Sequence, residues 1–327
     1  MRTLLDHLNL KLPIWSAGMG GGLAGPELVA AVCAAGGFGV LGAGSAPAAL
    51  ISTWIAQTRE LTSRPFGANI ILPMSDGSDV EACFDARVAV LVLFWGDAQP
   101  YVKDAHRRDM FVVAQCGGPE DAVAAADAGV DAVIVQGLEA GGHVKARAPL
   151  AATLKATLKV LGPVPVIAAG GIATGADIAA VLEHGAQAAS LGTRFVASLE
   201  AAACEGYKQR IVAAAAADTV MTTLFDIGWP NARHRVIRNT TYERWEAAGR
   251  PASGQRPGEK QAVGELLLNG QRVLLQRYSA IPPLQSFDGD LDAMALYAGE
   301  SVERIQDIVP AGELVERLLD ELRRAVN

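Results

Sequence analysis

A single histidine preceded by two glycines is the feature of this sequence that most suggests catalysis. His143 lies near the end of the stretch QGLEAGGHV and directly follows Gly141 and Gly142. A neutral imidazole near pH 7 is the usual general acid or base in proteins. The two glycines carry no side chains, so the backbone could lie against a ring-shaped ligand while the imidazole projects toward it. We therefore predict that His143 is catalytic and that Gly141 and Gly142 contact a cofactor.

Other polar residues near this stretch or of the same type have plainer interpretations. Glu139 is either a second acid or an anchor for the loop. His106 lies in a charged helical segment, and His184 lies at the end of a predicted helix, where a histidine interacts favourably with the helix dipole. Thr174 and Asp177 have the spacing of a helix N-terminal capping box rather than of a ligand site.

Three amide side chains stand at the carboxyl ends of apolar segments. Asn69 lies in PFGANI, Gln115 in VVAQC, and Gln136 starts QGLEAGGHV. Amides in such positions are costly unless they form hydrogen bonds. Gathered around one opening, they could bind a heterocycle with alternating donors and acceptors, such as a flavin. The alternative is that each amide only holds a loop in place.

Glycine-rich turns indicate where a phosphate would bind. Gly170 and Gly171 lie in AAGGIATG, and Gly192 and Thr193 lie in ASLGTRF. Backbone N–H groups at such turns approach a phosphate closely, and a threonine hydroxyl adds a donor. A third glycine-rich segment, SAGMGGG, would pack its backbone on a flat ligand around Met19. The predicted cofactor-binding residues are Ala17, Gly18, Met19, Asn69, Gln115, Gln136, Gly141, Gly142, Gly170, Gly171, Ser190, Gly192 and Thr193.

The scaffold that would bring these residues together is predicted to be a (β/α)8 barrel. Three segments share one pattern, an apolar helix that ends at a glycine (Gly36, Gly129 or Gly185) and then a β-rich run. These runs are apolar throughout, which is typical of parallel strands buried on both faces. In a barrel, the loops after the strands carry the functional residues. A doubly wound open sheet is the main alternative.

The predicted elements fill the first two thirds of the chain. The predicted strands are 14–19, 38–43, 66–71, 88–95, 110–116, 132–136, 164–169 and 188–192. The predicted helices are 26–35, 47–61, 78–86, 98–108, 119–128, 150–160, 175–184 and 201–216. Residues 1–216 would form the barrel, and residues 217–327 would form a cap over its mouth. The cap segment contains GRPASGQRPGEK, predicted to be an exposed loop, and ends in an amphipathic helix that returns to the barrel.

Composition and charge narrow the range of partners. The 327 residues carry a formal net charge of −7 without a Lys/Arg cluster, which argues against nucleic acids and anionic membranes. No run approaches the roughly 18 apolar residues of a membrane span. Four scattered cysteines fit a reducing, cytoplasmic setting and neither a disulfide framework nor a metal site. We expect a small-molecule substrate, and a homo-oligomer is compatible with the sequence.

The motifs together resemble those of the nitronate monooxygenases. The similarity rests on AGMGGG, PFGANI, QGLEAGGHV, AAGGIATG, LGTRF, FDIGWPNARHRVIRN and LYAGESV, which span nearly the whole chain. The resemblance implies an FMN-dependent barrel that uses O2 to oxidise alkyl nitronates, such as propionate 3-nitronate, to carbonyl compounds and nitrite. It implies that Gly171, Gly192 and Thr193 hold the FMN phosphate and that His143 is the base or orients the substrate. Were neutral nitroalkanes also substrates, we expect His143 to remove their α-proton, with a pKa near neutrality.

Two positions depart from the family pattern, and related activities share the motifs. Gly18 stands where many members have proline, which would loosen the flavin edge, and Glu300 stands where glutamine is commoner. The cluster around His143 also occurs in FMN-dependent enoyl thioester reductases and NAD(P)H:quinone reductases, which are the alternative activities. A flavin-binding protein without catalysis is a third alternative, and it would not need His143.

Overall fold

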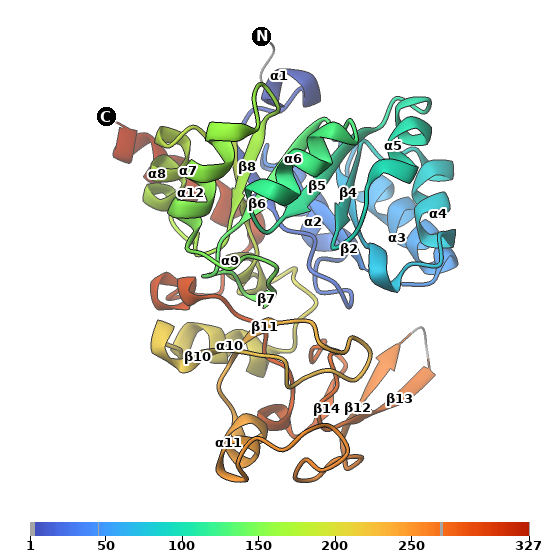
Figure 1. The fold of residues 1–327 in the computed structure, drawn as a ribbon, viewed down its shortest axis with the longest axis vertical. Coiled ribbons are helices and arrows are strands. Elements are labelled where there is room, and N and C mark those ends of the chain that lie inside the picture. Colours follow the sequence, from blue (N-terminus) through green and yellow to red (C-terminus); the bar gives the residue numbers. More distant parts are fainter. Residues whose placement is uncertain (1–3, 45, 269–270, 327) are drawn as a thin grey trace.

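Eight parallel strands form the centre of this computed structural model, which describes residues 4–44, 46–268 and 271–326 (Figure 1). Residues 1–3, 45, 269–270 and 327, which fall within the predicted barrel and cap segments, lie outside this description. The strand order is β1-β9-β8-β6-β5-β4-β3-β2. The strand bounds are β1 (Ile14–Ser16), β2 (Val40–Gly44), β3 (Gly67–Ile71), β4 (Val90–Phe94), β5 (Phe111–Cys116), β6 (Ala132–Gln136), β8 (Val166–Ala169) and β9 (Ala188–Leu191).

The two end strands of this order meet, so the sheet closes into a barrel. The Phe38 carbonyl accepts a hydrogen bond from Ser16 N (2.9 Å), and Phe38 N donates to the Ile14 carbonyl (2.8 Å). These bonds lie beside a parallel bridge between Trp15 and Phe38, just before β2. The predicted (β/α)8 barrel and its eight strands are therefore confirmed, and an open doubly wound sheet is excluded.

Two layers of apolar side chains build the core. Inside the barrel, Trp15 and Phe38 pack with valines and isoleucines from the strands, and Leu4 of the short helix α1 (Leu4–Leu8) joins them. A larger cluster fills the space between the strands and the surrounding helices. Because each strand is buried on both faces, its sequence is apolar throughout, as the repeat pattern indicated.

Seven of the predicted barrel helices are confirmed within two residues at each end. They are α2 (Pro26–Ala34), α3 (Ala48–Leu61), α4 (Ser78–Ala86), α5 (Gln99–His106), α6 (Pro119–Asp127), α7 (Leu150–Val160) and α8 (Gly175–Glu183). The capping box of Thr174 and Asp177 is present at the start of α8. Three of these helices, α2, α5 and α6, have a proline in their first turn, where its missing N–H costs nothing.

The eighth position in the helix ring is not filled by the helix predicted at 201–216. That segment forms α10 (Glu205–Ala213), which packs through Tyr207 and Ile211 on the segment around Leu296. The ring is completed instead by α12 (Ala311–Val326), which packs between α8 and α2 (Figure 1). The predicted return of the C-terminal helix is confirmed, and its tight seat explains the exchange, because a Cβ at Gly175 would lie 2.2 Å from Leu322 N.

The remaining elements lie at the carboxyl ends of the barrel strands, in the lower half of Figure 1. Strands β10, β11 and β7 form one antiparallel sheet, and β13, β12 and β14 form another. Their bounds are β7 (Gly142–His143), β10 (Thr219–Thr222), β11 (His234–Ile237), β12 (Ala262–Leu268), β13 (Gln271–Gln276) and β14 (Asp288–Gly289). The helices here are α9 (Thr193–Val196), α11 (Thr240–Ala247) and the short 3-10 turns η1 (Leu72–Met74), η2 (Ala216–Asp218), η3 (Leu291–Ala293) and η4 (Glu300–Arg304).

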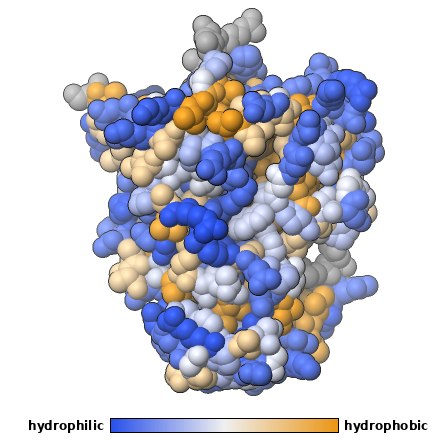
Figure 2. Space-filling model, viewed as in Figure 1, coloured by the Kyte–Doolittle hydropathy of each residue, from blue (hydrophilic) through white to orange (hydrophobic). Residues whose placement is uncertain are grey.

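The loop GRPASGQRPGEK is not exposed throughout, which corrects the expectation from its composition. Residues 252–255 are exposed, but Arg256 is only 7% exposed. The division of the chain into a barrel of residues 1–216 and a cap of residues 217–327 stays a prediction. In the part of the chain that the structure describes, no helix is both long and apolar enough to cross a membrane. Hydrophilic and apolar residues are interspersed on the face that Figure 2 shows.

Candidate active site

A cavity of about 630 Å³ opens where the barrel strands end and the cap begins. Its wall includes all fourteen residues predicted to form the site. They are Ala17, Gly18, Met19, Asn69, Gln115, Gln136, Gly141, Gly142, His143, Gly170, Gly171, Ser190, Gly192 and Thr193. The cap supplies the outer wall, chiefly residues 227–229, 273–276 and 279–282. A volume of this size is typical of a cofactor or substrate pocket.

The turn after β8 presents backbone donors to the cavity. Gly170 and Gly171 have φ angles of +105° and +72°, in the region that only glycine adopts without strain. The N–H groups of Gly171 and Ile172 have no hydrogen-bond acceptor among the described residues. The Gly171 carbonyl, in contrast, accepts a hydrogen bond from Arg304 (2.5 Å), which holds the turn from outside the cavity. This arrangement leaves two N–H groups for an anion.

The turn after β9 completes the same end of the cavity. Gly192 is the N-terminal cap of α9, so the first N–H groups of that helix have no partner within it. Space is left beside Gly192, where a Cβ would lie 3.8 Å from Ala17 Cβ and 3.9 Å from Met19 Sδ. The Thr193 hydroxyl accepts a hydrogen bond from Gly299 N (3.0 Å) and keeps its own proton to donate. These groups fit one phosphate.

Gly18 lies at a tightly packed edge of the cavity. A Cβ at Gly18 would lie only 2.4 Å from Asn69 Cβ, so the Asn69 side chain occupies the space that a larger residue would need. Whether glycine in place of proline loosens the flavin edge stays a prediction. Asn69 donates a hydrogen bond through Nδ2 to the Val92 carbonyl (3.2 Å), which leaves its Oδ1 as an acceptor.

The two glutamines differ in what they leave for a ligand. Gln136 donates to the His143 carbonyl (3.0 Å) and accepts from Lys145 N (2.9 Å), so its amide holds the loop that carries the histidine. For Gln136, therefore, most of the hydrogen-bonding capacity serves to hold a loop in place, as the alternative interpretation expected. Gln115 has no hydrogen bond from its side chain to any described residue, so both of its amide groups are available in the cavity wall.

The two glycines and the acid before His143 have separate structural reasons. The Glu139 carboxylate accepts hydrogen bonds from Leu150 N (2.9 and 3.2 Å) at the start of α7, which identifies it as a loop anchor. Gly141 packs against the backbone of the LYAGESV segment, and a Cβ there would lie 2.4 Å from Gly299 N. Gly142 has a φ of +71° and no such steric limit. The first glycine therefore allows close packing, and the second allows the turn.

Glu300, the second departure from the family pattern, forms an ion pair. Its carboxylate lies 2.9 Å from the guanidinium of Arg235, which also donates to the Leu138 carbonyl (3.0 Å). Glu300 N donates to the Glu139 carbonyl (2.9 Å). This residue therefore holds the loop before His143 from the cap side.

His143 stands in an aromatic cluster that the sequence analysis did not identify. Its ring stacks on Trp229 with centroids 4.0 Å apart and planes at 26°, and the Tyr297 ring lies 5.4 Å away. The His143 Nε2 atom is buried without a hydrogen-bond partner among the described residues. Trp229 lies in the motif FDIGWPNARHRVIRN, and Tyr297 lies in the motif LYAGESV. Both motifs contribute to the family resemblance, but neither residue was predicted to belong to the site.

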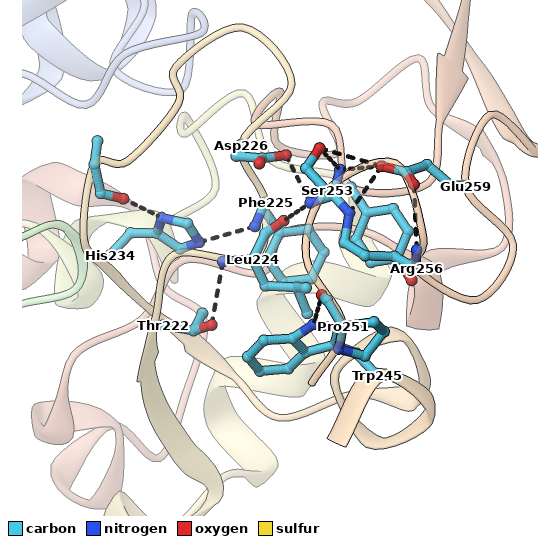
Figure 3. Close-up of polar contacts among 12 residues, drawn as sticks. Thr222, Leu224, Phe225, Asp226, His234, Trp245, Pro251, Ser253, Arg256 and Glu259 are labelled. Carbon is cyan, nitrogen blue, oxygen red and sulfur yellow. Dashed lines mark hydrogen bonds and ion pairs between the residues drawn. The ribbon is translucent and has the colours of Figure 1, made fainter. Parts of the chain in front are cut away.

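A second histidine, His234, lies beside the first and is itself neutral. His234 pairs with His143 across the β11–β7 ladder, and their ring centroids lie 5.2 Å apart. His234 bonds the Ala232 carbonyl through Nδ1 (2.9 Å) and accepts from Phe225 N through Nε2 (3.3 Å), which fixes a neutral tautomer (Figure 3). Burial lowers the pKa of His234 to about 4.

The pKa of His143 is far below the near-neutral value expected for a base. Burial of the ring, and then the charge that His234 would carry, lower the pKa of His143 to about 3. The ring is therefore a neutral hydrogen-bonding group across the physiological range rather than a proton acceptor poised near pH 7.

The cavity wall carries no formal charge. Among the described residues that line it there is no Asp, Glu, Lys or Arg. No group of three or more His, Cys, Asp or Glu side chains among the described residues is placed to hold a metal ion. The four cysteines are free, and burial raises the pKa of Cys33 to about 11 and that of Cys116 to about 12. Binding in this cavity therefore depends on hydrogen bonds, backbone dipoles and apolar contact.

Comparisons with known proteins place this chain in a family. The family model described as nitronate monooxygenase matches residues 2–321. A nitronate monooxygenase of Paraburkholderia phytofirmans is 34% identical over 269 residues, which cover 68% of this chain and 73% of that protein. A (3aS,4S,5R,7aS)-5-hydroxy-7a-methyl-1-oxo-octahydro-1H-indene-4-carboxyl-CoA dehydrogenase of Mycobacterium tuberculosis is 30% identical over an alignment of length 346. That alignment covers 98% of this chain and 95% of that protein.

A solved structure with the same architecture extends this similarity to three dimensions. FabK from Thermotoga maritima aligns with a TM-score of 0.83 and 30% sequence identity, covering 100% of this chain and 97% of that one. The likeness therefore includes the cap as well as the barrel. The chain belongs to the nitronate monooxygenase family.

Proposed function

We propose that this chain binds FMN in the cavity and oxidises alkyl nitronates with O2 to carbonyl compounds and nitrite. Its family consists of flavin-type oxidoreductases. The observation that carries the proposal is the convergence of fourteen residues, predicted from separate motifs, on one cavity wall. At one end this wall has free backbone N–H groups that would hold one phosphate, and the imidazole of His143 lies in the same cavity. The predicted cytoplasmic location and small-molecule partners belong to the same proposal.

The residues present fit FMN. The N–H groups of Gly171 and Ile172, the start of α9 and the Thr193 hydroxyl would hold the phosphate. Asn69 Oδ1 and the Gln115 amide would form hydrogen bonds with the ring system. When bound, FMN supplies the redox chemistry, taking electrons from the carbon substrate and passing them to O2. The protein supplies binding, orientation and an environment without charge.

His143 suits a substrate that has already lost its α-proton. A group with a pKa of about 3 is a poor base at pH 7, and a nitronate, unlike a neutral nitroalkane, needs no base. The neutral ring lines the cavity, and a ring nitrogen that faces the cavity would form a hydrogen bond with the nitro group and orient it. We therefore assign His143 the role of orienting the substrate and propose the nitronate, rather than the nitroalkane, as the form that reacts.

The test of this function uses the purified protein in air. The protein should be yellow, should release FMN rather than FAD on denaturation, and should form nitrite from propyl-2-nitronate without a pyridine nucleotide. A colourless protein that also fails to bind added FMN would exclude the flavin assignment. Bound FMN that neither nitronate nor NAD(P)H reduces would favour a flavin-binding protein without catalysis.

A second candidate is NAD(P)H-dependent reduction of a conjugated thioester, whose reacting group is neutral and therefore suits the uncharged cavity wall. Removing an anion from water without a cationic partner costs several kcal/mol. The cavity wall includes large apolar side chains such as Phe94, Trp229 and Leu275. A relative covering almost the whole chain is named as a carboxyl-CoA dehydrogenase. An anaerobic spectrum separates the candidates. Rapid bleaching of the flavin by NADH or NADPH, without bleaching by nitronate, would select the reductase.

A further inference from the structure

A buried arginine in the cap holds the chain segment that carries Trp229. Arg256 lies in the loop GRPASGQRPGEK, and its side chain is only 4% exposed. Its guanidinium donates hydrogen bonds to the Leu224 carbonyl (3.0 Å) and to the Asp226 carboxylate (2.8 Å), as Figure 3 shows. Both acceptors lie within five residues of Trp229, on the segment that enters the cavity wall.

The same guanidinium is fixed by its own loop on the other side. It donates to the Glu259 carboxylate (2.9 and 2.6 Å) and to the Ser253 hydroxyl (3.1 Å), and it lies 4.2 Å above the ring of Tyr278. Together with the bonds to Leu224 and Asp226, these contacts use all five donors of the planar fork. Arg256 therefore has one geometry, and the groups that it binds are placed relative to it.

Two further connections lead from this arginine to His143. Trp229 N donates to the Asp226 carbonyl (3.1 Å), and the Trp229 ring stacks on the His143 ring. Phe225 N, next to Leu224, donates to His234, whose strand pairs with the strand of His143 (Figure 3). The segment held by Arg256 therefore contacts the catalytic candidate directly through Trp229 and indirectly through His234.

Stability alone does not account for such a cluster. A buried arginine with two carboxylates is often no more stabilising than apolar residues of similar size, because the charges lose their hydration. Five directed hydrogen bonds do specify one conformation, which apolar packing specifies less sharply. We propose that Arg256 is a positioning residue that seats Trp229 on His143 and so sets the orientation of the imidazole in the cavity. The proposal rests on the proposed function only for the effect on turnover.

The experiment compares Arg256→Met and Arg256→Lys with a matched control, Arg250→Met. Arg250 lies at the start of the same loop, pairs with Glu246 (2.5 Å) and lies 5.7 Å from the centroid of the Trp245 ring. It forms no hydrogen bond or ion pair with residues 224–229, all of which the structure describes. The structural readout is the ring-proton NMR signal of His143, assigned with His143→Asn, because the stacked Trp229 shifts it. The kinetic readout is kcat and KM for a nitronate, and for NADPH if that proves to be the substrate.

We expect Arg256→Met to move the His143 signal and to lower kcat at least about tenfold at unchanged FMN content, since small misplacements cost 10–10² in rate. Arg256→Lys can pair with Asp226 but cannot form all five hydrogen bonds, so its His143 signal and kcat should lie between those of the wild type and Arg256→Met. Arg250→Met should match the wild type in both readouts. A native His143 signal and native kcat in Arg256→Met would overturn the proposal, as would a lowered melting temperature with both readouts unchanged. If Arg256→Met does not fold, Asp226→Asn gives the same test. The NMR readout applies even if nitronate is not the substrate.

Discussion

The two ends of the cavity are formed by different parts of the chain, mainly backbone groups at one end and side chains at the other. At the inner end, the wall is formed by backbone groups of Gly170, Gly171 and Gly192 and by the amide side chains of Asn69, Gln115 and Gln136. At the outer end, His143, Trp229 and the β12–β13 hairpin form it from side chains. The inner end is placed by the closed barrel, whose strands end side by side. The outer end depends on contacts between segments that are far apart in the sequence.

This difference predicts how each end responds to substitution. Backbone-built sites fail when a side chain is added, because the added atoms meet neighbouring backbone. A site formed by side chains fails when those side chains lose their orientation, so a substitution there lowers the reaction rate before it lowers the free energy of unfolding. The stretch QGLEAGGHV connects the two ends, and variants within it test the comparison most directly.

The largest effect is expected from adding one carbon at the junction of the two ends. In Gly141→Ala the new Cβ would lie 2.4 Å from Gly299 N, so the 298–299 segment must move away. We expect a loss of about 3 kcal/mol in the free energy of unfolding and loss of bound FMN. Gly142→Ala is the control, and its positive φ should cost about 1–2 kcal/mol with FMN retained. Urea unfolding and the flavin-to-protein ratio measure both, and equal losses would refute the distinction.

The next largest effect is expected from substitution of His143, which should lower the reaction rate and leave the FMN content unchanged. We expect His143→Asn to lower kcat about 10²-fold, roughly 2.7 kcal/mol of barrier, because one oriented hydrogen bond is lost. Losses on nitronates and neutral nitroalkanes should be equal, since the pKa of about 3 makes the ring no base for either. Steady-state rates and the FMN absorbance of the variant check this. A loss confined to nitroalkanes would restore the role of a general base.

A smaller effect should appear in the dependence of stability on pH. The pKa values of His143 and His234 fall from 6.5 in the unfolded chain to about 3 and about 4 in the folded protein. Below pH 6.5 the unfolded chain binds more protons than the folded one, so stability falls as pH falls toward 4. The loss should be about 1.4 kcal/mol per pH unit for each histidine. Chemical unfolding at pH 6 and pH 5 should show about half this slope in His143→Asn, and an unchanged slope would contradict the assignment.

The smallest effect is expected at the rim of the outer end. Leu274 is 70% exposed and lines the cavity, whereas Leu267 is 51% exposed on the same hairpin and does not line it. Leu274→Ser should change the free energy of unfolding by less than about 0.5 kcal/mol. It should raise KM for a substrate with a long apolar chain about fivefold, roughly 1 kcal/mol of lost contact. Leu267→Ser should leave KM unchanged. Equal effects of the two substitutions on KM would show that the hairpin is not part of the substrate site.

The fold was predictable because its signals are local. Each barrel unit shows its own apolar strand and glycine-terminated helix, and the strand ends must meet once the barrel closes. All fourteen predicted site residues were therefore found on one cavity wall. The exception was the eighth helix, because a helix at 201–216 was expected on the barrel, whereas α10 packs on the segment around Leu296 and α12 packs on the barrel.

What the sequence determined by itself was the barrel, the position of the glycine-rich turns after β8 and β9 and the set of residues around the barrel mouth. What only the tertiary structure decided was their chemical state. His143 is a neutral ring because Trp229 and His234, about 90 residues later, bury it, and Arg256 is a buried anchor in a segment that composition marks as exposed. The reason is physical: a backbone turn is specified by adjacent residues, whereas desolvation and orientation depend on whichever distant side chains pack against a group.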